Sequence, residues 1–176
     1  MDPRVERHAE VIVEHSVGVE AGDEVMINAP AEAEPLVVAL NERLGERGAR
    51  PVHVGRSARA QRAFMRAMDP DAHEGPPEGL MRLAEGVDVA IGVRAAANTH
   101  ETGDVPPEKN SAYARMMKPI QEEMMAKRWV GTQHPAPGNA QDAEMSTEAY
   151  ENFVYGAIDK DWAAQREHQE QLVDIL

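Results

Sequence analysis

Residues 87–93 read VDVAIGV, an apolar run interrupted by a single aspartate. A run of this length and composition is typical of a strand covered on both faces of a parallel sheet. Three other short runs share this character: EVMINAP at residues 24–30, PVHVG at 51–55 and RWVGTQ at 128–133. No Asn-Gly or Asp-Gly pair joins two of these runs, so the pattern gives no sign of antiparallel hairpins.

Segments with the helical spacing of apolar residues precede, separate and follow the predicted strands. The first begins with Asp2 as N-cap and Pro3 at the first helical position. The others are expected at residues 35–48 and 56–68, in a short segment ending at 86, at 108–125, and from 147 to the end. This alternation predicts an α/β fold: an open, mainly parallel sheet of about four or five strands with helices on both faces, and a long C-terminal helix.

The composition limits the possible kinds of protein. A chain of 176 residues favours one domain whose core is large enough to fold without disulfides or a structural metal. There is no cysteine, which excludes disulfides, cysteine nucleophiles and thiolate-bound zinc. The net charge is −13, and the 18 basic residues are mostly arginine. Such a surface fits a halophilic protein, whose self-repulsion is screened by counterions, although an ordinary acidic bacterial protein is an alternative.

The same composition bears on partners and location. An acidic chain is a poor partner for nucleic acid, because phosphate binding requires a basic surface. No apolar run approaches the ~20 residues of a membrane span. The charged start MDPRVERHAE does not have the pattern of a signal peptide. We therefore expect a cytoplasmic protein that binds neither nucleic acid nor membrane.

Motifs that would carry chemistry are absent or incomplete. HEGPP from His73 and HETGD from His100 lack the second histidine of a helical HExxH zinc site. A looser cluster of His100, Glu101, Asp104 and His134 is possible, but hydrated loop residues are the better interpretation. The chain has no glycine-rich phosphate loop and no GxSxG nucleophile motif. The sequence predicts no catalytic residue and no metal ligand in this chain.

The loops that leave the carboxyl ends of the strands are the candidate binding regions, because sites in open α/β sheets form there. They include NAPAEAE from Asn28, RAAANTHETGD from Arg94, and QHPAPGNAQDAEMST at 133–147. One basic feature lies nearby: Arg59, Arg62 and Arg66 share a helix face. This face is either an anion-binding stripe or, as we prefer, a solvated face paired with surrounding carboxylates.

Residues 133–162, QHPAPGNAQDAEMSTEAYENFVYGAIDKDW, carry a resemblance to a known family. The stretch resembles the segment before the interdomain connection in the thermophilic-metalloprotease aminopeptidases, of the aminopeptidase T and aminopeptidase S type. The N-terminal helix, strand and helix are similar in kind, as is the loop from Asn98 to Pro107. The most specific part is a Pro-x-Pro-x-x-Ala-Gln…Met-Ser-x-Glu pattern, formed by Pro135, Pro137, Ala140, Gln141, Met145, Ser146 and Glu148.

The resemblance implies homodimeric exopeptidases that remove N-terminal residues from peptides with two divalent metal ions. In that family the metal ligands and a catalytic tyrosine belong to a C-terminal domain, so no ligand transfers to this chain. Residues 1–145 would form the non-catalytic α/β domain, and 146–176 a long helix leading toward a missing catalytic domain. Asn98 and His134, at neighbouring strand ends, are then candidates for facing the substrate chamber.

Two other functions stay open at this point. One is a stand-alone domain that binds a small molecule or nucleotide at the strand-end loops. The other is a dimerisation module whose last helix pairs with its copy. The apolar terminus Leu172–Leu176 requires a cover, either a partner subunit or further chain.

Overall fold

Four parallel strands form the sheet of the computed structural model, which describes residues 1–72, 75–162, 164–166 and 169. The strands are β1 (Glu24–Pro30), β2 (Arg50–Arg56), β3 (Val89–Arg94) and β4 (Arg128–Gln133). Their spatial order is β2-β1-β3-β4. The prediction of an open parallel sheet is confirmed, and each strand lies within a residue or two of the apolar run that predicts it.

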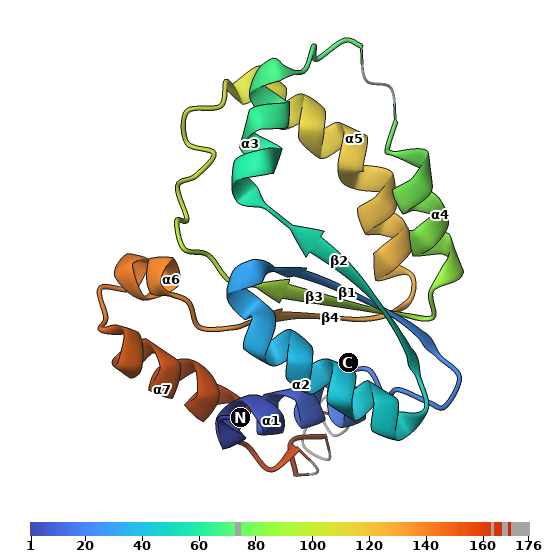
Figure 1. The fold of residues 1–176 in the computed structure, drawn as a ribbon, viewed down its shortest axis with the longest axis vertical. Coiled ribbons are helices and arrows are strands. Elements are labelled where there is room, and N and C mark those ends of the chain that lie inside the picture. The colour runs from blue at the N-terminus through green and yellow to red at the C-terminus, as the bar shows by residue number, and fades with distance from the viewer. Residues whose placement is uncertain (73–74, 163, 167–168, 170–176) are drawn as a thin grey trace.

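Helices cover both faces of this sheet, as predicted (Figure 1). On one side lie α1, α2 and α7, and on the other α3, α4 and α5. Among the described residues no helix is both long and apolar enough to cross a membrane. The bounds are α1 Pro3–Glu10, continued by a π-helix Val11–Ser16, α2 Glu34–Arg47, α3 Ala58–Ala67, α4 Glu78–Gly86, α5 Pro107–Met125, α6 Pro137–Asp142 and α7 Thr147–Ile158.

The main hydrophobic core lies between the sheet and the layer of α1 and α2. Successive side chains of a strand point to opposite faces, so alternate residues of β1 and β3 enter this core. They meet the apolar faces of the two helices. The core residues that anchor it include Ile12, Val25, Ile27, Leu36, Leu40, Val89 and Ile91, all almost fully buried.

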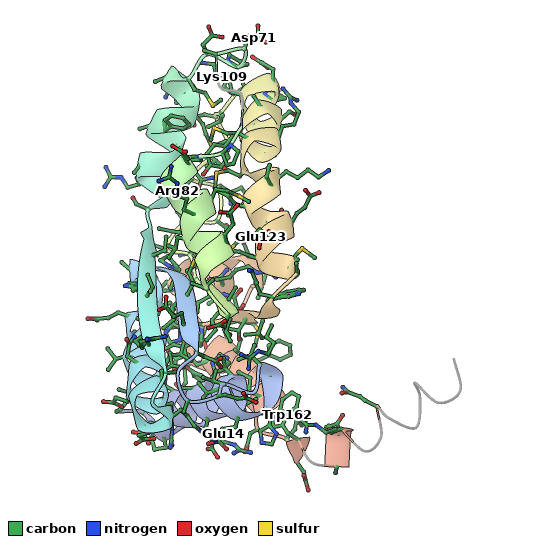
Figure 2. The ribbon with its side chains drawn as sticks, turned by 90° about the vertical axis from the view of Figure 1, so that its right-hand side faces the viewer. Glu14, Asp71, Arg82, Lys109, Glu123 and Trp162 are labelled. Carbon is green, nitrogen blue, oxygen red and sulfur yellow. The ribbon has the colours of Figure 1, made fainter. Side chains whose placement is uncertain are left out.

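The opposite face of the sheet is covered less completely. Its buried cluster contains only Met26, Val87 and Ala90, with partly buried side chains from β2, α4 and α5 around it. Figure 2 shows α3, α4 and α5 extending away from the sheet rather than lying flat on it, with Lys109 at the far end of α5. There the Lys109 ammonium donates to the carbonyl of Arg66 in α3. The helices α3, α4 and α5 therefore pack mainly against one another.

The last helix is shorter than the sequence predicts. A single helix from Thr147 to the end is expected, but α7 ends at Ile158, Asp159 has a non-helical ψ of 76°, and helical residues resume at Trp162. The Trp162 indole N–H then donates to the Ile158 carbonyl, which satisfies one of the acceptors that a helix end leaves free. The apolar terminus Leu172–Leu176 lies outside the described residues.

The face that α7 buries is narrower than the helical spacing of its apolar residues predicts. Phe153 is 65% exposed, whereas Val154 and Tyr155 are buried. Tyr155 packs against α1, where its ring meets that of His8 edge to face. Sequence spacing assigns Phe153 and Val154 equally to the apolar face, and only the position of α1 separates them.

Two neighbouring valines of α2 provide a test of the main core. Val37 is 8% exposed and contacts the core, whereas Val38 is 41% exposed. We expect Val37→Ala to lower the free energy of unfolding by about 2 kcal/mol, because it removes buried methyl groups and leaves a cavity. Val38→Ala is the matched control with the same change in helix propensity, and its effect should be close to zero. Equal losses in urea unfolding would contradict this packing.

Candidate functional site

The sheet opens between β1 and β3 at its carboxyl edge. The β1–β2 pairing continues to Pro30 and Arg56, and the β3–β4 pairing to Arg94 and Gln133. The β1–β3 pairing, however, ends earlier, at Asn28 and Gly92. The chain leaves β1 for α2 on one face and leaves β3 toward α5 on the other, which makes this the point where ligands bind in open α/β sheets (Figure 1).

Arg56 lies across this opening. A guanidinium N–H of Arg56, at the end of β2, donates to the Val93 carbonyl of β3, which lies beyond the end of the β1–β3 pairing. Burial and the nearby charge of Arg94 lower the pKa of Arg56. Among the described residues no carboxylate pairs with Arg56 or with Arg94. Two cationic groups therefore face the carboxyl edge without an acidic partner.

Two hollows lie at this edge. One, of about 210 Å³, lies between the turn after β1 and the loop after β3, with Arg59, Glu32 and Glu101 at its rim. The other, of about 390 Å³, is lined by Arg56 and Arg94 together with the amide side chains of Gln61, Gln133 and Asn139. Such groups can hold a small polar or anionic molecule. In the first hollow the Ser57 hydroxyl caps α3 by accepting the Ala60 N–H, and in the second the Thr99 hydroxyl bonds to the exposed His100 ring.

Asn98 lies on the rim of the first hollow, as expected for a strand-end residue. It is exposed, its amide donates to Glu101 at 3.1 Å, and its Oδ1 accepts the His100 backbone N–H at 3.0 Å. These bonds hold the loop after β3 in shape.

His134 lies in a different environment. It follows β4, its backbone N–H donates to the Arg94 carbonyl at 2.8 Å, and only 6% of the residue is exposed. It lines neither hollow. The described structure does not bring Asn98 and His134 together, and their role at a substrate chamber stays a prediction.

The buried surroundings of His134 include a second histidine that sequence reasoning overlooked. His8 of α1 shares a hydrogen bond with the Thr132 hydroxyl at 2.7 Å. Its ring contacts Tyr155, over which the Arg4 guanidinium lies at 4.8 Å. The position of His8 between Val5 and Ile12 in an apolar helical pattern could have indicated its burial. The partners come from β4 and α7, far along the chain.

Burial opposes the protonation of both histidines. Burial and the charge of His134 lower the pKa of His8 to about 4. Burial also lowers the pKa of His134, although Glu151 acts in the opposite direction. The Nδ1 atoms of both rings are buried without a hydrogen-bond partner in the described structure. The cluster is therefore a pH-sensitive part of the packing.

The stretch predicted as a loop after β4 contains the short helix α6. The Gly138 N–H donates to the Ala96 carbonyl at 3.0 Å, and the Asn139 side chain accepts the Ala96 N–H at 3.0 Å. A Cβ at position 138 would lie 2.6 Å from the Ala96 oxygen, closer than atoms can approach. This segment is therefore a clamp that fixes the loop after β3 at the candidate site.

The looser metal cluster considered from the sequence does not assemble among the described residues. Asp104 instead pairs with Arg62 and Arg66, which confirms for these two arginines the interpretation of a paired helix face. His100 bonds to its neighbour Thr99, and His73 lies outside the described residues. No three His, Asp or Glu side chains in the described part of the chain lie close enough to hold a metal ion. These residues do not fit a divalent metal centre.

The buried His8 makes stability depend on pH. We expect the free energy of unfolding to fall as the pH decreases from about 6.5 to about 4, because only the unfolded chain binds a proton in this window. The pKa of His8 is lowered from 6.5 to about 4 in the folded chain, so the loss of stability is complete below about pH 4. It amounts to about 3 kcal/mol, at about 1.4 kcal/mol for each pH unit.

The measurement is urea unfolding across this pH window. His8→Gln should flatten the profile, since glutamine does not titrate and can still bond to Thr132. His53→Gln, on the exposed part of β2, is the control and should keep the wild-type slope. A wild-type slope in His8→Gln would show that other groups cause the loss.

The clamp of α6 predicts a glycine effect. Gly138→Ala should destabilise the protein by about 1–3 kcal/mol, because the added methyl group must displace backbone. Gly156 of α7 has open space around its Cβ position, so Gly156→Ala should raise stability by about 0.5–1 kcal/mol. Opposite shifts in the thermal midpoint are expected, and shifts of the same sign would argue against the close approach.

The structure is similar to wild-type AmpT from Thermus thermophilus at 21% sequence identity and a TM-score of 0.73, covering 96% of this chain and 46% of AmpT. CurK enoyl reductase matches at 13% identity and a TM-score of 0.38, covering 96% of this chain and 50% of CurK. A putative NADPH:quinone reductase from Bacillus thuringiensis matches at 14% identity and a TM-score of 0.36, covering 92% of this chain and 51% of the reductase. Overlays this loose bear on neither fold nor function.

The chain thus spans less than half the length of AmpT, and no curated protein matches it. A family model does match, described as thermophilic metalloprotease (M29), and it matches residues 1–176. This chain belongs to the thermophilic metalloprotease (M29) family.

Proposed function

We propose that this chain is a non-catalytic N-terminal domain of a metal-dependent aminopeptidase that removes N-terminal residues from peptides. The observation that carries the proposal is the combination of family and coverage: the M29 model matches residues 1–176, yet the overlay accounts for 46% of AmpT. The described residues lack a three-residue metal-ligand group, which supports placing the reactive groups on other polypeptide.

Several details of the proposal come from the resemblance. Two divalent ions would be held outside this chain, and they would supply Lewis-acid and water-activating chemistry there. The chain itself would contribute walls and polar groups, with Asn98 and His134 on the side of the substrate. We propose a homodimer in the cytoplasm of a halophile, for which the net charge of −13 is suitable.

A second candidate is a small-molecule-binding domain, favoured by one specific observation. The sheet opens between β1 and β3, and Arg56 and Arg94 face this opening without an acidic partner among the described residues. Open α/β sheets bind ligands at such a point. A small molecule that stays with the purified chain through dialysis would favour this candidate over an accessory domain.

An activity comparison tests the first proposal. The 176-residue chain should hydrolyse no aminoacyl-p-nitroanilide in Co²⁺, Mn²⁺ or Zn²⁺, and it should retain less than one equivalent of metal after dialysis, measured by mass spectrometry. AmpT from Thermus thermophilus, of which this chain covers 46%, serves as the comparison and should cleave the same substrates. Hydrolysis by the 176-residue chain, lost on treatment with a chelator, would overturn the assignment of a non-catalytic domain.

A further inference from the structure

A groove of about 430 Å³ lies between the second face of the sheet and the C-terminal part of α5. Its floor contains Asn28, Gly92 and Gly131, which occupy the same register on three neighbouring strands. Because two of the three residues have no side chain, the floor is flat backbone. The helices on this face extend away from the sheet (Figure 2), and Gly131 of the floor is exposed.

The walls of the groove at one end are apolar and accessible. Trp129 of β4 is 49% exposed and Met125 of α5 is 51% exposed. Met26 and Ala90 continue the apolar lining into the small buried cluster. A tryptophan with half its surface exposed beside an uncovered sheet can pack against an apolar group of moderate size.

The other end of the groove is cationic, since Arg56 and Arg94 also line it. Neither pairs with a carboxylate among the described residues, although the whole chain carries 31 acidic and 18 basic side chains. The bond from Arg56 to the Val93 carbonyl fixes one guanidinium and leaves most of its five N–H donors free. Two such groups form a site for a carboxylate.

Asn28 adds a requirement for a donor. Its Oδ1 is buried and has no hydrogen-bond partner in the described structure. A buried acceptor without a donor costs free energy that a ligand can recover by supplying an N–H. The floor therefore contains an unpaired amide oxygen between the apolar and the cationic ends.

We propose that this groove binds an N-acylated apolar amino acid through its free carboxylate, as in the last residue of a peptide. The carboxylate binds to Arg56 and Arg94, the amide N–H donates to Asn28, and the apolar side chain lies over Gly92 and Gly131 beside Trp129. No phosphate loop or glycine-rich turn accompanies the arginines, so a nucleotide lacks the backbone donors that it normally uses. The proposal does not depend on peptidase activity.

The chain has two tryptophans, so a single substitution provides a reporter in the groove. Trp162→Phe leaves Trp129 as the only tryptophan. Titration of this variant with N-acetyl-L-leucine should give a saturable change in emission with a Kd of about 1 mM, the affinity expected of so small a ligand. N-acetyl-L-leucinamide lacks the negative charge and cannot form the ion pair with the arginines. It should therefore bind at least tenfold more weakly, roughly the effect of losing one charge-assisted contact.

Two further substitutions in the same background test the two ends of the site. Arg94→Gln should weaken binding at least tenfold, and the exposed Arg115→Gln on α5 should leave it unchanged. Gly131→Leu should abolish binding by filling the groove. A Cβ at position 131 has room, since its nearest neighbour is the Trp129 ring at 3.9 Å. Circular dichroism confirms folding, and Arg94→Gln alone decides the question if Gly131→Leu does not fold.

The outcomes separate the possible sources of the ligand. Binding of both N-acetyl-L-leucine and acetyl-Gly-Gly-Leu supports a site for peptide termini, whereas binding of N-acetyl-L-leucine alone supports a site for free acylated amino acids. Equal affinity for acid and amide, wild-type affinity in Arg94→Gln, or no saturable change would each overturn the proposal. None of these results depends on hydrolysis, so failure here leaves the proposed accessory role untouched.

Discussion

The strand order β2-β1-β3-β4 forces the chain to leave β1 toward one face of the sheet and β3 toward the other. Adjacent strands that diverge in this way cannot continue their pairing, and the ladder between them ends at Asn28 and Gly92. The Val93 carbonyl then accepts from Arg56 instead of from β1. The crevice, the arginine that crosses it and the groove beside it all follow from this divergence.

The two faces of the sheet therefore contribute differently to the stability of the fold. One face buries alternate residues of β1 and β3 under α1 and α2 and supplies the main hydrophobic stabilisation. The other is buried only around Met26, Val87 and Ala90, because α3, α4 and α5 pack mostly on one another. Its two glycines contribute no apolar side chain to burial. Because this face contributes little to stability, its residues can line a ligand-binding groove without a large loss of folding free energy.

The strands and most helices could be predicted because their signals are local: continuous apolar runs, caps and helical spacing. The helix α6 was missed because Pro135, Pro137 and Gly138 predict a loop, whereas its conformation depends on hydrogen bonds to Ala96. The contacts of the candidate site could not be predicted from the sequence. His8 with His134, and Arg56 with Val93, are contacts between distant segments, and no spacing in the chain encodes them. Asn98 lies in the loop after β3, and the position of that loop at the carboxyl edge follows from topology alone.

Several of the residues that carry the family resemblance have packing or capping roles. Pro137 starts α6, Gly138 lets its backbone approach the loop after β3, and Ala140 is almost fully buried. Ser146 caps α7 by accepting the Ala149 N–H. None of these roles involves a reacting atom. The stretch therefore identifies how this domain folds and holds its carboxyl edge in place.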